Sequence, residues 1–213
     1  ERLVAMDTRN GTGDEVACVR ILRSALAAHR PDRLICETVK RSRGKSDSAY
    51  VMAAWGTPRI VLNVHIDTVP SGSGWTGDPH VLRRDGDRYI GLGSSDIKGA
   101  AACIMAVLET VKPKDVAILF SGDEEHGSEI MPAVISRAHF GGAPMAIVCE
   151  PTGCKPGRRH RGMLALSAKF TGPGGHSSLS DLTAAPLLSA SRLAAKIGDY
   201  GDKHRSFGDA PYK

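Results

Sequence analysis

The stretch PRIVLNVHIDTVP, residues 58–70, decides the fold of this chain. Apolar residues run almost without interruption from 60 to 64, as in a central strand that is buried on both faces of a sheet. The stretch GLGSSDIKGAAA, residues 91–102, follows later, and its small residues predict a helix from residue 98 that can pack close to a sheet. A buried strand followed along the chain by a helix is the unit of an α/β fold.

Possible metal ligands lie at the end of the strand predicted over residues 60–64 and after it. His65 ends it, Asp67 follows two residues later, and Asp96 stands just before the predicted helix. Such side chains rarely gather at the end of a buried strand without a metal or a catalytic task. Since the side chains of His65 and Asp67 leave an extended chain on the same face, Asp67 can accept the imidazole N–H and hold the ring. We therefore interpret this segment as half of a metal site.

Further short apolar runs over 116–120 and 146–149 predict two more buried strands, with a helix over about 128–139 between them. Strand, helix, strand, helix, strand is the order of an α/β fold with a doubly wound, mixed sheet. The remaining patterns before residue 116 predict a helix, a strand pair and a hairpin, over 14–29, 34–39, 49–55 and 81–92.

The composition shifts near residues 153–159, a connector rich in Gly, Pro and Arg. We therefore expect two domains: 1–157 as the N-terminal part of a metal-binding catalytic domain, and 158–213 as a smaller second domain. In the latter, alternation over 163–170 predicts a half-exposed strand, and 182–197 predicts an amphipathic helix. Because one strand and one helix cannot close a domain by themselves, we expect the second domain to be cut short.

Each of the three buried strands ends in an ionisable group: His65, the pair Glu124 and Glu125, and Glu150. In open α/β sheets, sites form at the carboxyl ends of the strands. Lone buried carboxylates are costly unless they are paired or bound to a metal. The coincidence favours a metal site over a set of solvated loop acids and one core histidine.

The ligand types narrow the choice of metal. Carboxylates with a histidine and no nearby cysteine suit Zn²⁺ in a catalytic site, or Mn²⁺ or Co²⁺. Glu124 and Glu125 are adjacent, so their side chains diverge. One can bind metal while the other acts on water as a general base, and their spacing leaves open which does which.

Five motifs occur in a fixed order along the chain: HIDT (65–68), GLGSSDIKG (91–99), SGDEEHGS (121–128), EPT (150–152) and GGHSS (174–178). They resemble the zinc-dependent M20 family of amidohydrolases and peptidases. Within that family the likeness is greatest to deacetylases of N-acetylornithine and N-acetylcitrulline, with succinyl-diaminopimelate desuccinylase as a near relative. The resemblance implies a zinc aminopeptidase-like catalytic domain and a smaller α+β, ferredoxin-like domain that serves as lid and dimerisation surface.

The resemblance also implies a ligand set for two zinc ions per complete subunit. In it, His65 and Glu150 bind one ion, Glu125 binds the other, and Asp96 bridges the two. The peptide bond that follows Asp96 is expected to be cis. A further histidine ligand would come from a part of the catalytic domain beyond residue 213, so we expect this piece alone to bind one metal firmly at most and to have little activity.

Three residues receive catalytic roles from the same resemblance. Asp67 orients His65, and Glu124 is the general base that activates water and passes its proton to the leaving amine. His176 reaches the active site of a partner subunit and stabilises the tetrahedral oxyanion. The expected protein is thus a homodimer.

The expected activity is removal of an acetyl group from an N-acetyl amino acid such as N-acetylornithine or N-acetylcitrulline, in arginine biosynthesis. Two other hypotheses assume the same metal site with a different substrate: the enzyme would be a desuccinylase, or a dipeptidase or carboxypeptidase. A hypothesis of another class is that the protein is a non-catalytic remnant that dimerises or binds a partner through residues 158–213.

Composition excludes several classes of partner. The 213 residues are 41% hydrophobic and 24% charged, and their formal charge of +5 is mild. The basic clusters lack the flanking aromatics of a single-strand binder, so no nucleic acid is expected. No apolar run has membrane-spanning length. Five cysteines without a C-x-x-C pair favour free thiols in a reducing compartment, and hence the cytoplasm.

Overall fold

The structure is a computed structural model that describes residues 1–42, 46–138, 140–158, 165–172, 176, 178 and 185–204. The chain divides into two units, Glu1–Lys155 and Pro156–Lys213. This division lies close to the one expected after residue 157. The roles expected for the two parts, catalytic domain and lid, stay predictions.

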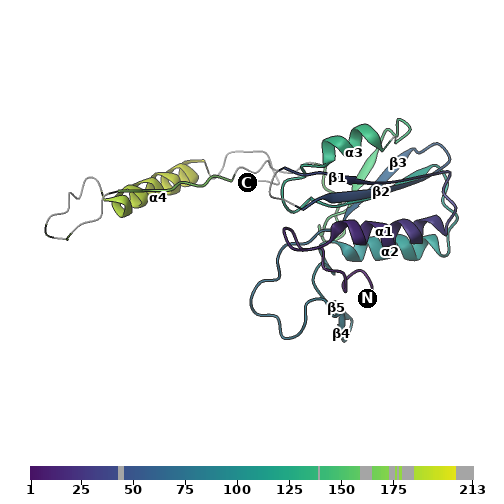
Figure 1. The fold of residues 1–213 in the computed structure, drawn as a ribbon, viewed down its shortest axis with the longest axis horizontal. Helices are drawn as coiled ribbons and strands as arrows, with labels where there is room; N and C mark the ends of the chain where they lie inside the picture. The colour runs from purple at the N-terminus through teal and green to yellow at the C-terminus, as the bar shows by residue number, and fades with distance from the viewer. Residues whose placement is uncertain are drawn as a thin grey trace. The chain divides into compact units, whose positions relative to one another are not determined.

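A five-stranded sheet in the order β1-β2-β6-β3-β7 forms the centre of the first unit (Figure 1). β3 runs parallel to both of its neighbours, β6 and β7, whereas β2 runs antiparallel to β1 and β6. The predicted mixed, doubly wound sheet is therefore confirmed. Its strands are β1 (Arg33–Val39), β2 (Ser48–Trp55), β3 (Ile60–His65), β6 (Val116–Ser121) and β7 (Ala146–Val148).

Helices cover both faces of this sheet. α1 (Glu15–Ala27) and α2 (Lys98–Leu108) pack on one face and α3 (Met131–Arg137) packs on the other (Figure 1). Because alternate residues of a strand point to opposite faces, Phe120 joins the apolar cluster beneath α1 and α2, whereas Leu119 joins the cluster beneath α3. The core thus has two layers, one on each side of the sheet.

The predicted hairpin is the pair β4 (Arg83–Asp85) and β5 (Arg88–Ile90). α3 is shorter than the helix expected over 128–139, because the backbone before it forms a turn. The Ser128 amide donates to the carbonyl of Asp123, and the Ile130 amide donates to its carboxylate.

In the second unit, α4 (Pro186–Lys203) begins and ends later than the helix expected over 182–197. The strand expected over 163–170 is wrong for the part that the structure describes, since 165–170 form no strand. A strand needs a hydrogen-bonded neighbour, and no described residue pairs with this segment. Leu166, expected on the covered face, is 84% exposed.

Two expectations about surroundings can be compared with the structure. Among the described residues, no helix has the length and apolar character needed to cross a membrane. All five cysteines are free, as expected. Cys18 is buried, but Cys103 is exposed, because it lies on the outer side of α2.

Candidate metal centre

The order of the parallel strands creates the site. β3 lies between β6 and β7, so the three carboxyl ends emerge side by side at one edge of the sheet. His65 is the last residue of β3, Glu124 and Glu125 follow the end of β6, and Glu150 follows the end of β7. The fourth carboxylate, Asp96, arrives from the segment that leads into α2.

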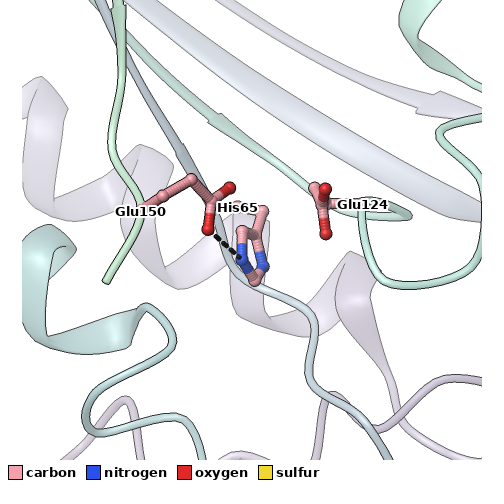
Figure 2. A group of neighbouring side chains, drawn as sticks. All are labelled: His65, Glu124 and Glu150. Carbon is pink, nitrogen blue, oxygen red and sulfur yellow. Dashed lines mark ion pairs between the residues drawn. The ribbon is translucent and has the colours of Figure 1, made fainter. Parts of the chain in front are cut away.

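His65 is the centre of this arrangement. Its Nε2 atom lies 3.0 Å from Oδ1 of Asp96 and 3.9 Å from Oε2 of Glu150. Figure 2 shows the imidazole between Glu150 and Glu124, with the ion pair to Glu150 dashed. These three side chains come from three different strand ends.

Two groups of possible ligands share this histidine. One is His65, Glu124 and Glu150, and the other is His65, Asp96 and Glu125; within each group, one ligand atom per residue lies within 4.8 Å of the others. Ligand atoms lie about 2.0–2.3 Å from a zinc ion, so each group needs only a small contraction to surround a cation. Both glutamates of the pair reach the centre, so these spacings do not separate the metal ligand from the general base.

Asp67 fixes the position of the loop that carries Glu124 and Glu125. Its side chain is fully buried, and its carboxylate accepts hydrogen bonds from the amides of Glu124 at 3.1 Å and Glu125 at 3.0 Å. A third bond comes from Asn10 Nδ2 at 3.1 Å. The nearest oxygen to His65 Nδ1 is the backbone carbonyl of Asp67 at 3.0 Å, whereas its carboxylate is 3.6 Å away. Asp67 therefore ties the end of β3 to the loop after β6, in addition to facing the imidazole.

Sequence reasoning did not find Asn10. Residues 8–10 run beside 66–68: Thr8 Oγ1 donates to the carbonyl of Ile66, and the Asn10 amide donates to that of Thr68. Asn10 reaches Asp67 only because of this pairing, which no local pattern in the sequence indicates.

The charges at the centre suit a cation. Burial alone would lower the pKa of His65, but the neighbouring carboxylates of Asp67, Glu150 and Glu124 outweigh it and raise the pKa to about 9. Burial raises the pKa of Glu150, and the negative charges of Glu124 and Asp96 add to this. Because the acids repel one another, a bound cation would relieve their repulsion and displace the imidazole proton.

Burial likewise raises the pKa of Glu125, with the charge of Asp96 as the next cause. Burial also opposes ionisation of Asp67, but His65 and the amides of Glu125 and Glu124 outweigh it and keep the pKa of Asp67 below its usual value. Asp67 thus stays an anion that accepts hydrogen bonds.

The donor set fits the metals expected from the sequence. One imidazole and several carboxylates, with no thiolate in either group, suit Zn²⁺, Mn²⁺ or Co²⁺. The side chains of Asp96 and Glu150 are 48% and 36% exposed, so a substrate can reach the centre from solvent. The peptide bond between Asp96 and Ile97 is cis, as the resemblance implies.

His176 belongs to the second unit. It is exposed, and its Nδ1 atom lies 2.7 Å from Oγ of Ser178. Its expected role at the site of a partner subunit stays a prediction.

Comparison with known proteins identifies relatives of this chain. The model of peptidase family M20/M25/M40 matches residues 61–201. N-acetyl-L-citrulline deacetylase of Xanthomonas campestris pv. campestris is 37% identical over 213 residues, which is 98% of this chain and 56% of that protein. Acetylornithine deacetylase of Aliivibrio fischeri is 35% identical over 133 residues, 58% of this chain and 34% of the relative. The chain thus spans about half the length of the first relative and a third of the second.

Two solved structures share the fold. Human carnosine dipeptidase 1 aligns with a TM-score of 0.54 and 15% identity over 70% of this chain and 37% of its own. The di-peptidase Dug1p from Saccharomyces cerevisiae aligns with a TM-score of 0.55 and 13% identity over 70% of this chain and 36% of its own.

Proposed function

Since this chain belongs to peptidase family M20/M25/M40 and is thereby a hydrolase of amide bonds, we propose that it removes the acetyl group from an N-acetylated amino acid, of the N-acetylornithine or N-acetylcitrulline kind. The observation that carries the proposal is the pair of ligand groups that share His65. The names of the two deacetylase relatives support the choice of acyl group.

We assign the binding of two divalent cations, zinc in the first place, to four side chains; residues 1–213 alone should hold only one of the two firmly. His65 and Glu150 would hold one, Glu125 the other, and Asp96 would lie between them. The short distance from Asp96 to the imidazole supports this assignment. Bound cations of this kind polarise an amide carbonyl and make water more acidic.

Glu124 is the proposed general base. It takes a proton from water as the water oxygen bonds to the acetyl carbon, and it returns that proton to the amine nitrogen as the C–N bond breaks, which leaves acetate and a free amine. Asp67 supports this role, because its hydrogen bond to the Glu124 amide fixes the backbone that carries the base. His176 of a partner subunit would stabilise the oxyanion.

The setting of the proposed enzyme follows from the same reasoning. We place it in arginine biosynthesis in the cytoplasm, where free cysteines stay reduced, and as a homodimer formed through the second unit. Sedimentation of the purified protein tests the dimer.

An assay of hydrolysis tests the activity. The chain, and any longer product of its gene, is loaded with Zn²⁺, Co²⁺ or Mn²⁺ and given N-acetylornithine, N-acetylcitrulline, N-succinyl-diaminopimelate and dipeptides. We expect acetate release to exceed the other reactions, and to be weak when only residues 1–213 are present. If succinate release or dipeptide cleavage is faster, the proposed substrate is wrong but the proposed metal-dependent hydrolysis stands. A complete gene product without bound metal would favour the hypothesis of a non-catalytic remnant.

The variant Glu124→Gln tests the base. We expect it to lose about 10²–10⁴-fold in kcat, because the amide cannot take a proton, while zinc still binds. The control Glu109→Gln changes a carboxylate that is 72% exposed and lies outside the centre, and it should leave kcat unchanged. Equal activity of Glu124→Gln and the unaltered protein would contradict the assignment.

A further inference from the structure

A buried arginine lies beneath the loop that carries the two glutamates. Nη1 of Arg41 donates to Oδ1 of Asp123 at 2.8 Å and lies 3.3 Å from Oε1 of Glu15. The side chains of Arg41, Asp123 and Glu15 are 2%, 0% and 2% exposed. Asp123 immediately precedes Glu124 and Glu125, whereas Arg41 comes from the segment between β1 and β2.

Asp123 closes the loop that contains the glutamates. Its Oδ2 atom accepts the amide of Ile130 at 3.1 Å, and its carbonyl accepts the amide of Ser128 at 2.7 Å. Its φ is +68°, in the left-handed region that residues with a Cβ adopt infrequently, although aspartate and asparagine do so more often than most. The carboxylate bonds therefore hold Asp123 in a conformation that its backbone disfavours.

The guanidinium is fixed from several sides. Nε of Arg41 donates to the carbonyl of Ser46 at 2.6 Å, and Nη2 donates to Oγ of the same residue at 2.8 Å. Glu15, at the start of α1, is bonded in turn by the hydroxyl of Ser48 in β2. The planar fork of Arg41 thus joins α1, β2 and the loop after β6, and a lysine ammonium cannot reproduce this set of directions.

We propose that Arg41 is a positioning residue of the metal centre: it fixes Asp123 and thereby sets the direction in which Glu124 and Glu125 leave β6. Asp67 holds the two amides from one side, and Arg41 holds the preceding residue from the other. When the guanidinium is lost, rotation at Asp123 swings both glutamates together. The structural part of this inference stands alone; its catalytic consequence rests on the proposed function.

Amide exchange in the metal-free chain tests the inference without any activity. In Arg41→Lys we expect the amides of Glu124 and Glu125 to exchange roughly tenfold faster, with β2 and β3 unchanged, because the partners that lose the guanidinium (Asp123, Ser46 and Glu15) all lie outside these strands. Asp123→Asn, which keeps one acceptor oxygen but replaces the other with an NH₂ donor and removes the charge, should loosen the same amides. The control Arg137→Lys alters an exposed ion pair to Glu37, in which the Arg137 side chain is 52% exposed. It should leave the exchange rates of the Glu124 and Glu125 amides unchanged.

Zinc affinity gives the second readout. In competition with a chelator, Arg41→Lys should bind zinc about 10–100-fold more weakly, the usual loss when a residue that orients ligands is changed. The visible spectrum of the cobalt-loaded variant should shift as the ligand field changes. Where hydrolysis is measured, kcat should fall about 10–100-fold while KM changes less than about threefold.

Unchanged loop exchange together with unchanged zinc affinity in Arg41→Lys would overturn the inference. Uniform loss of protection along the whole chain in both Arg41→Lys and Asp123→Asn would also overturn it, since Arg41 would then hold the fold rather than the loop. If the loop loosens in a protein that hydrolyses none of the substrates, the inference stands and the proposed function fails.

Discussion

Glu15 shows what burial does to a single carboxyl group in this chain. Burial is the main cause that raises its pKa to about 7, and the charges of Asp67 and Asp123 add to it, while Ser48 and Arg41 act in the opposite direction. Gly122 allows this carboxylate to approach the sheet, because a Cβ at that position would overlap Oε2 of Glu15.

The raised pKa of Glu15 predicts a pH-dependent stability. Between pH 4.5 and 7 the folded state binds more protons than the unfolded state, so the free energy of unfolding falls as pH rises, by roughly 3 kcal/mol in all. Glu15→Gln has no such proton to lose. Urea unfolding at pH 5 and pH 8, in the presence of a chelator, should show a smaller fall for Glu15→Gln than for the unaltered chain. Identical falls in the two proteins would refute this.

His65 belongs to both ligand groups, so its loss should differ from the loss of an acid. We expect His65→Ala to abolish binding of the cation that His65 and Glu150 would hold together, whereas Glu150→Gln, which keeps one oxygen ligand, should only weaken it. Native mass spectrometry after zinc titration counts the bound ions. His204→Gln, in the second unit, serves as the control; zinc binding by His65→Ala that equals that of the unaltered chain would exclude the assignment of His65.

The strand ends were predictable from the sequence because each buried run stops at an ionisable residue. His65, Glu124, Glu125 and Glu150 were all found in this way, and the structure places them at one edge. Asn10, Arg41 and Asp123 were not found as supporting residues. They act through contacts between segments far apart in sequence, and such contacts leave no periodic pattern.

At the scale of elements, β7 is the weakest support of the centre. The strand predicted over 146–149 as buried is exposed at all three residues of β7, and among the described residues it pairs only with β3, yet Glu150 depends on it for its place. The amide of Cys149 donates to the carbonyl of Asn63 at 2.9 Å, which fixes the residue directly before the glutamate.

Cys149→Pro removes this donor and should displace Glu150 while the rest of the sheet stays intact. We expect zinc affinity to fall about tenfold, as for other changes that misorient a ligand, and the free energy of unfolding to fall by about 1 kcal/mol for one lost hydrogen bond. Cys149→Ala keeps the amide and is the matched control. Equal zinc affinity in the two variants would show that β7 does not set the position of Glu150.

Elements that bury residues on a regular period were predicted well, and those that depend on a partner were not. β3 extends over its apolar run and one residue beyond it, to His65, and every residue of the run is buried or half-buried. α3 starts later than predicted, since the amide of Ile130 donates to the Asp123 carboxylate and thereby belongs to the preceding turn. The predicted strand is wrong over its described part, residues 165–170, because its alternation gives no information about a pairing neighbour.

At the scale of the whole molecule, two apolar clusters stabilise the first unit without help from the ligand residues. The chain should therefore keep its circular dichroism spectrum in a chelator. Zinc at one hundred times its dissociation constant should raise the free energy of unfolding by about 2.7 kcal/mol. Unfolding of the chain on removal of metal would contradict this and would make the centre part of the core.

One consequence of the topology concerns variation rather than chemistry. His65 and Asp96 are in contact although the hairpin β4-β5 and two loops separate them along the chain, so the two ends of this excursion meet at its base. Gly72 and Gly74, in the loop before the hairpin, lie in open space. Because loop closure costs little more as a loop lengthens, insertions there should leave the ligands in register. The segment between His65 and Asp96 can thus vary in length and sequence during evolution, and with it the substrates that reach the metal centre, while the sheet edge that carries the ligand residues stays unchanged.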